Sequence, residues 1–167
     1  PQRLVLHAQQ PGGEPVREYS GEGELPEAIE FDGRSDDGTR LSEGTYRAEI
    51  SVLYVNGNAP TATTPEFVVD LTPPEATVDP EYRVFSPDGD GRKDVIVFEQ
   101  EATPESEWRG VILDSAGDVV FESRFIGEAD EEFQWDGTDA EGRPVPDGTY
   151  TYVLQTEDTA GNDGAAP

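Results

Sequence analysis

The chain has 167 residues and carries 37 acidic residues against 11 basic ones, a net charge of −26. This sign argues against nucleic-acid binding, because Lys and Arg make the contacts to phosphate, and against an anionic membrane surface. The sequence contains no stretch of about 20 apolar residues, so it does not predict membrane insertion. The sequence has no cysteine, which excludes disulfides and thiolate chemistry, and its single histidine, His7, excludes a His-rich metal site.

The composition predicts an all-β protein. Glycine (18) and proline (14) are plentiful, and aromatic residues recur among short apolar runs, as in chains of short strands joined by many turns. The high acidity with one lysine, Lys93, is typical of a halophilic protein and equally of an ordinary acidic secreted protein. The N-terminus has no initiator methionine and no signal-peptide pattern, so we expect a processed product or a piece of a longer protein.

The first strand with a clear period follows the turn "SEGTY". Tyr46, Ala48, Ile50 and Val52 lie two residues apart with polar residues between them, which predicts a strand with one buried face. Upstream, "SDDGT" predicts a tight connection between strands, and Phe31 ends the strand before it. Phe31 and Tyr46 are therefore predicted core residues.

The segment "VVDLTPPEATVDP" predicts a boundary between two modules. Pro73 and Pro74 end a strand and stiffen the passage to the next one. We predict module 1 over residues 1–72 and module 2 over residues 73–167. Each contains short strands without convincing helical periodicity, which is the pattern of a β-sandwich.

Module 2 opens with two strand candidates that flank the acidic stretch "FSPDGDGRKD". Asp88, Asp90 and Asp94 have the i, i+2, i+6 spacing of calcium loops, and Gly91 allows a sharp turn. Carboxylates on alternate residues of a tight loop can point at one centre, and Ser86 can add an oxygen. These four oxygen-bearing residues form a predicted calcium site.

An alternative interpretation of this stretch is structural. The site is not an EF-hand, because Val97 occupies the position of the bidentate glutamate, and Arg92 and Lys93 compete for the carboxylates. Asp88 and Asp90 can instead accept backbone N–H groups in an Asx-type turn. Both interpretations remain open from the sequence.

A second copy of the first pattern follows at a constant offset. Residues 31–58 align without a gap on residues 135–162, an offset of 104. The identical pairs are Asp32/Asp136, Gly33/Gly137, Gly38/Gly142, Gly44/Gly148, Thr45/Thr149, Tyr46/Tyr150, Gly57/Gly161 and Asn58/Asn162. Glycines recur where turns need positive φ. Trp135 and Tyr150 are the predicted core residues of the second copy.

The two modules are incomplete in complementary ways. The two strand candidates that open module 2 have no counterpart in module 1, and the strand in "TATTPEFVVDLTPP" has none after Asn162. An unpaired sandwich edge is a liability. We therefore expect neighbouring modules or another copy of the chain to supply the missing strands by strand complementation.

The block "WDGTDAEGRPVPDGTYTYVLQTEDTAGN" resembles the C-terminal part of the immunoglobulin-like domain of bacterial flagellar hook-capping proteins and Ig-like modules of large bacterial secreted and surface proteins. "FSPDGDGRKDVIVF" resembles the strand opener of related modules. The resemblance covers most of residues 75–162 and, more weakly, 3–58, where Phe31 replaces the tryptophan. It implies tandem immunoglobulin-like β-sandwich modules, in which Tyr46 and Tyr150 form tyrosine corners.

Other acidic clusters are interpreted as turn caps and solvated faces. The clusters are Asp32, Asp36 and Asp37, then Asp136, Asp139 and Glu141, and the run "EADEE" at residues 128–132. Paired carboxylates can serve a glycosidase, but carboxylates are so abundant that any pair is weak support. No phosphate loop, nucleophile elbow or metal-binding histidine set accompanies them, so we predict no enzyme activity.

The predicted function is an extracellular or cell-surface structural module, an acidic spacer or subunit of a filament or adhesin, from a bacterium or archaeon. Its predicted partners are other copies or neighbouring modules of the same protein. One alternative is a hook-cap-like assembly scaffold. Another is a carbohydrate-binding or accessory domain of a secreted enzyme, which requires an exposed aromatic platform; Trp108 is the one tryptophan left for this role.

Overall fold

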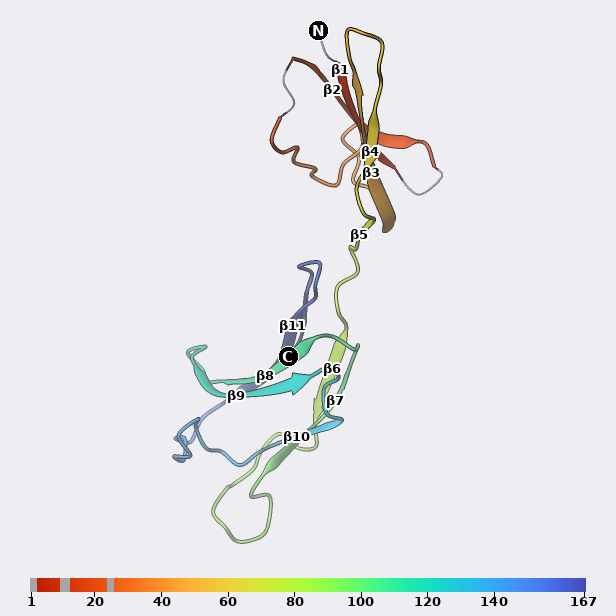
Figure 1. Ribbon diagram of the computed structural model, residues 1–167. Helices are drawn as coiled ribbons and strands as arrows, with labels where there is room; N and C mark the ends of the chain where they lie inside the picture. Colours follow the sequence, from red (N-terminus) through yellow and green to blue (C-terminus); the bar gives the residue numbers. More distant parts are fainter. Residues whose placement is uncertain (1–2, 10–12, 24–25) are drawn as a thin grey trace. The chain divides into compact units, whose positions relative to one another are not determined.

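The computed structural model describes residues 3–9, 13–23 and 26–167, with side chains from residue 13 onward. These ranges contain strands, turns and loops (Figure 1), and no helix long and apolar enough to cross a membrane occurs in them. The chain divides into two compact units, Pro1–Leu71 (unit 1) and Thr72–Pro167 (unit 2). The predicted all-β class with tandem immunoglobulin-like modules is confirmed.

Unit 1 contains one antiparallel sheet. Its strands are β1 (Arg3–Gln9), β2 (Pro15–Glu22), β3 (Gly44–Leu53), β4 (Thr61–Thr63) and β5 (Phe67–Val69). The order is β2-β1-β3-β4, and β5 also pairs with β3. The described residues of unit 1 form no second sheet. Among the residues of unit 1 whose side chains the structure describes, the buried apolar ones are Leu41, Tyr46 and Val52.

Unit 2 is a two-sheet sandwich. Its strands are β6 (Ala76–Pro80), β7 (Ile96–Ala102), β8 (Glu107–Leu113), β9 (Val119–Ile126), β10 (Glu132–Trp135), β11 (Thr151–Glu157) and β12 (Asp163–Ala166). One sheet has the order β10-β7-β6 and the other β12-β11-β8-β9. This three-plus-four arrangement of antiparallel strands is that of an immunoglobulin-like sandwich.

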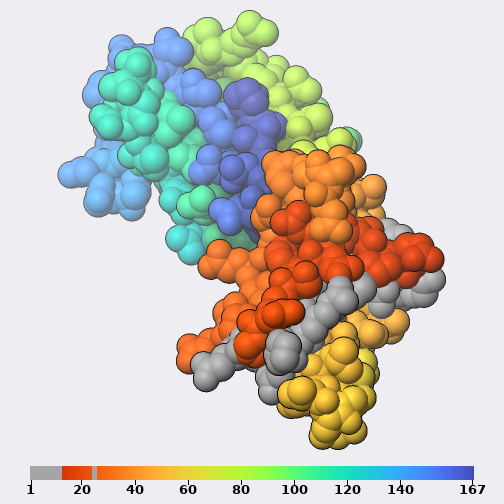
Figure 2. All heavy atoms as spheres, turned by 90° about the horizontal axis from the view of Figure 1, so that it is seen from above, coloured from red at the N-terminus to blue at the C-terminus, as the bar shows by residue number. Residues whose placement is uncertain are grey.

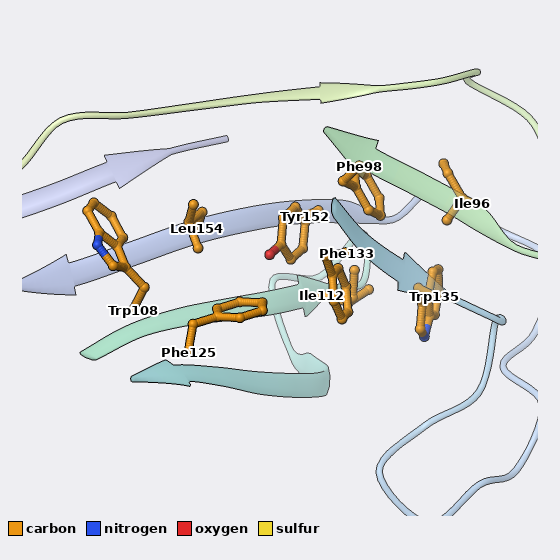
Figure 3. Packing of buried hydrophobic residues seen from close by; sticks show 9 residues of the cluster. All are labelled: Ile96, Phe98, Trp108, Ile112, Phe125, Phe133, Trp135, Tyr152 and Leu154. Atoms are coloured by element: carbon orange, nitrogen blue, oxygen red, sulfur yellow. The ribbon is translucent and has the colours of Figure 1, made fainter. Parts of the chain in front are cut away.

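The core of unit 2 lies between its two sheets (Figure 3). Inward side chains recur at alternate positions of the strands, as the pleat requires. Nine of them form one buried cluster: Ile96, Phe98, Trp108, Ile112, Phe125, Phe133, Trp135, Tyr152 and Leu154. The Tyr152 ring stacks on Phe98 at 4.5 Å and on Phe133 at 4.9 Å between centroids.

The internal repeat is preserved in the strands of one sheet. Strands β1 and β2 lie 104 residues before β8 and β9, with the same lengths. The pairing register also repeats, since Val5 faces Ser51 as Arg109 faces Gln155. The sheet of unit 1 is therefore the β12-β11-β8-β9 sheet built a second time.

Two sequence expectations need correction. Phe31 does not end a strand, because residues 26–33 of unit 1 form none, and its side chain is half-buried. Residues after Asn162 do form a strand, β12, which pairs with β11 as β4 pairs with β3. The short run "DGAA" lacks β-branched residues, and pairing with β11 determines its conformation.

Candidate functional site

The acidic stretch forms the exposed connection between β6 and β7, at the surface of unit 2 (Figures 1 and 2). The Ser86 amide donates to the Lys93 carbonyl at 3.0 Å and closes the loop. Gly89 and Gly91 have φ of 80° and 81°, and Lys93 has 57°. These left-handed residues turn the backbone sharply.

The three aspartates of this loop bind its own backbone. The two Asp94 carboxylate oxygens accept the amides of Gly89 and Gly91, both at 2.8 Å. Asp88 accepts the Asp90 amide at 3.1 Å, and Asp90 accepts the Arg92 amide at 2.7 Å. The loop therefore has the Asx-turn geometry of the structural interpretation.

The same geometry brings together the predicted calcium ligands. Ligand oxygens of Asp88, Asp90 and Asp94 all lie within 4.8 Å of one another. Ser86 donates its hydroxyl to Asp88 at 3.4 Å and so stays beside them. Because a carboxylate has about four lone-pair sites, accepting one or two amides leaves capacity for a cation. The chemistry of this oxygen set fits a hard cation such as Ca²⁺.

The cations of the loop do not neutralise these aspartates. In residues 85–94, which the structure describes throughout, no ion pair joins Arg92 or Lys93 to the three carboxylates. The Lys93 ammonium instead lies over the Tyr82 ring, 4.4 Å from its centroid. Lys93 does not compete for the carboxylates here, because its ammonium makes a cation–π contact with Tyr82 instead.

Aromatic packing anchors the loop on the second motif of unit 2. The Phe85 ring lies 5.6 Å from the Trp135 ring, and the Trp135 indole donates to the Thr138 carbonyl at 2.8 Å. A Cβ added at Gly137 would lie 2.9 Å from the Pro87 ring. The "FSP" and "WDG" motifs therefore interlock, and glycine is required at this close approach.

Two of the remaining acidic clusters cap turns, and the acidic residues of the run 128–132 are exposed. Ser35 and Thr39 hydrogen-bond to the Asp37 carboxylate, and the Ser35 hydroxyl is the larger cause that lowers the pKa of Asp37 to about 2. The Arg143 guanidinium lowers the pKa of Asp139, to which it donates at 2.8 Å. Among the described residues, the Asp88 cluster is the one group of three acidic residues gathered closely enough to share an ion.

Both predicted tyrosine corners are present. The Tyr46 hydroxyl donates to the Ser42 carbonyl at 3.0 Å, and the Tyr150 hydroxyl donates to the Pro146 carbonyl at 2.7 Å. Each bond reaches four residues upstream and ties the turn to the strand that follows. Tyr46 is buried, whereas Tyr150 is half-buried against the Trp135 ring at 5.2 Å.

The glycan-platform hypothesis for Trp108 is wrong. This side chain is 0 % exposed in the core, and its indole donates to the Thr103 carbonyl at 2.8 Å. An aromatic platform for sugars must be exposed. Trp108 lies on the inward face of β8 together with Ile112, which is 1 % exposed.

Sequence reasoning missed a buried polar pair between the sheets. The Tyr152 hydroxyl of β11 donates to the Gln100 side-chain oxygen of β7 at 2.8 Å. Both residues are buried, and burial raises the pKa of Tyr152. The period-two pattern Ile96, Phe98, Gln100 contained the signal, because it places Gln100 on the inward face.

A strand glycine makes room for this tyrosine. A Cβ at Gly110 would lie 2.3 Å from the Tyr152 hydroxyl oxygen. Glycine in a strand interior often marks such a close approach, and this signal was available in the sequence.

The model of the CHU_C type IX secretion signal domain family matches residues 80–165. The chain belongs to this family. The matched CHU_C region runs from the end of β6 into β12 and includes the acidic loop and the Trp135 turn. Family membership agrees with the expected extracellular or cell-surface location. The family match supports an immunoglobulin-like domain of a secreted or surface protein, and not the hook-capping proteins in particular.

Curated relatives of the chain include C5a peptidases of Streptococcus pyogenes serotype M3, from strains ATCC BAA-595 / MGAS315 and SSI-1. Each is 30 % identical over 91 residues, and the match covers 44 % of this chain and 8 % of the peptidase. The chain thus spans a small part of the relatives it matches.

Similar solved structures include a tetra-tandem repeat from the extending region of a large adhesion protein (19 % identity, TM-score 0.43, covering 99 % of this chain and 40 % of that one). Dimeric latent PorU from Porphyromonas gingivalis has 17 % identity and a TM-score of 0.41, covering 99 % of this chain and 16 % of that one. The amphioxus IgVJ-C2 molecule has 14 % identity and a TM-score of 0.32, covering 98 % and 84 %.

Proposed function

We propose that this chain is a non-catalytic module of a secreted or cell-surface protein, in which unit 2 is a type IX secretion signal and unit 1 is a spacer. The observation that carries the proposal is the family match over residues 80–165. The separate similarity to the 30 % identical peptidases covers only 8 % of their length, so their peptidase activity gives no support for catalysis here.

A spacer role is supported by the way unit 2 holds its linker. Pro74 is buried, and a Cβ added at Gly164 of β12 would lie 2.6 Å from the Pro74 carbonyl oxygen. Strand β12 therefore closes on the proline, whose φ is already fixed. This contact fixes the point at which the chain enters unit 2. A spacer that transmits force along its backbone needs such a fixed entry point.

Secretion of a reporter tests the signal assignment. A reporter protein is joined to the N-terminus of the chain and expressed in a bacterium that has the type IX system. We expect the reporter in the medium or on the cell surface, and inside the cell in an isogenic strain that lacks the translocon. Equal export from both strains, or retention in both, would refute the assignment.

Calcium is a second proposal, supported by the gathered oxygens of Asp88, Asp90 and Asp94. If Ca²⁺ binds at a hundred times its Kd, the folded unit gains about 2.7 kcal/mol. The midpoint of thermal unfolding is measured with calcium and with chelator. Asp90→Asn should abolish the difference, and Glu128→Gln, which removes one exposed carboxylate elsewhere, should leave it unchanged. An identical midpoint in calcium and chelator rejects the site.

A further inference from the structure

We propose that the sheet of unit 1 is covered by a two-stranded segment of the β6–β7 type, supplied by the parent polypeptide directly before Arg3. The inference stands on the internal repeat and is independent of the proposed export function. The register of the repeat shows which part of the module unit 1 contains. Leu4 faces Gly21 as Trp108 faces Phe125, and Ile50 faces Ala62 as Leu154 faces Ala166. In unit 2 the inner face of this sheet packs against β10, β7 and β6.

The counterpart of β10 identifies what unit 1 needs. In unit 2, residues 132–135 form β10 by pairing with β7. The equivalent residues 28–31 of unit 1 form no strand, since no strand of the β7 type lies beside them in the described residues. Their side chains nevertheless alternate as in β10, with Ile29 and Phe31 turned inward and their neighbours exposed.

Burial differs between the two copies at the positions that β6 and β7 cover. Phe133 and Trp135 are 8 % and 3 % exposed, whereas their counterparts Ile29 and Phe31 are only half-buried. Leu154 is 0 % exposed. Its counterpart Ile50 on β3 is only half-buried. In the same way, Tyr152 is buried and its counterpart Ala48 is half-buried.

The turn glycine gives a third, independent comparison. Gly137 is covered by Pro87 and Phe85, from the segment between β6 and β7, whereas a Cβ at the equivalent Gly33 would meet nothing within 4 Å. Phe67 of β5 provides one substitute contact, because it packs against Phe31 at 6.0 Å and stacks on Tyr46 at 6.2 Å between centroids. The Tyr19 hydroxyl of β2 also donates to the Glu30 carbonyl at 3.2 Å. Two aromatic side chains of the described residues therefore contact this segment, whereas in unit 2 the strands β7 and β6 cover the equivalent face.

The source of the segment follows from the chain order within unit 2. Strand β7 leads into β8 through residues 103–106, so the same connection in unit 1 would lead directly into β1. A second copy is a poorer source, because its β6 and β7 already cover its own core and their transfer would expose that cluster.

The test uses residues available in this chain. Residues 75–106 are joined as a second copy directly before Arg3, in place of residues 1–2, so that the connection has the length found in unit 2. Hydrogen exchange is followed at residues 28–31 and 46–52 of the extended and the parent chains. We expect exchange to slow by roughly tenfold or more in the extended chain. The matched control carries Val97→Pro and Glu99→Pro in the added copy alone, which prevents strand pairing.

Three results would overturn the proposal. Residues 28–31 could exchange equally fast in the parent and extended chains. The proline control could protect them as well as the intact segment, which would indicate non-specific collapse. The parent chain could protect them in a concentration-dependent dimer, measured by light scattering, which would assign the strands to a second copy. Failure of reporter export leaves all three measurements unaffected, so the two proposals fail separately.

Discussion

The hydrogen bond between Tyr152 and Gln100 joins the two sheets of unit 2 inside their core, and its contribution can be isolated. Tyr152→Phe keeps the ring stack on Phe98 but removes the donor to the Gln100 oxygen. Gln100 is 3 % exposed, so its oxygen loses a partner that water does not replace. Leaving a buried acceptor unsatisfied costs about 1–3 kcal/mol. For a domain of this size, about 2 kcal/mol lowers the midpoint by roughly 8–16 °C.

The partner residue is tested by Gln100→Met, which keeps the length of the side chain and completes a double-mutant cycle with Tyr152→Phe. It leaves the Tyr152 hydroxyl without an acceptor, but it also removes the buried Gln100 side-chain amide nitrogen, which has no partner among the described residues. The double variant, Gln100→Met with Tyr152→Phe, replaces both polar partners by apolar groups. Its stability should therefore return near that of the parent, with a coupling of about 1–3 kcal/mol.

Tryptophan fluorescence is the assay of choice. The chain has two tryptophans, Trp108 and Trp135, and they are 0 % and 3 % exposed in the core of unit 2. Urea or thermal unfolding followed by their emission therefore reports unit 2, although the chain has two units. If the double variant lost as much stability as the sum of the single variants, the bond would contribute nothing and the argument would fail.

The pH dependence gives an internal check on the burial of the Tyr152 hydroxyl. Burial raises the pKa of Tyr152 above the usual value near 10. A group whose pKa is raised in the folded state contributes stability below its unfolded pKa and loses it as the pH rises. Unit 2 of the parent should thus weaken above about pH 10, and Tyr152→Phe should flatten this decline. An unchanged alkaline slope in the variant would contradict the assignment.

Three further outcomes are expected. Gly110→Ala places a Cβ 2.3 Å from the Tyr152 hydroxyl oxygen and should destabilise unit 2 by about 1–3 kcal/mol; an unchanged fluorescence midpoint would show that the ring moves freely. Gly164→Ala places a Cβ 2.6 Å from the carbonyl of the second linker proline and should speed exchange in β12, whereas unchanged protection would show that the strand is not held there. The Ser35 hydroxyl lowers the pKa of Asp37 to about 2, so this carboxylate stabilises unit 1 above pH 4 and the effect disappears as the pH falls through 2. The stability of unit 1, followed by NMR against pH, should therefore fall less steeply in this range in Asp37→Asn. An identical fall in the parent and the variant would count against the assignment.

The periodic parts of the sequence predict much of the fold. Alternation identifies β3 and β11, and the constant offset of 104 identifies a module built twice, because paired strands in the same register need the same spacing of turns and inward residues. The tyrosine corners followed from the family resemblance, and each depends on contacts within a few residues. Short strands were not: β12 has no distinctive composition, and it forms because the edge of β11 is available to it.

The candidate ion site is divided in the same way. The sequence by itself determined that three aspartates share one tight loop and that the chain is acidic throughout. Only the tertiary structure decided that the Lys93 ammonium lies over Tyr82, that Trp108 is inside the core, and that residues 28–31 form no strand. The physical reason is that turns and strand periods arise from local backbone preferences. Burial and pairing, in contrast, depend on which distant segment occupies the opposite face of the sheet.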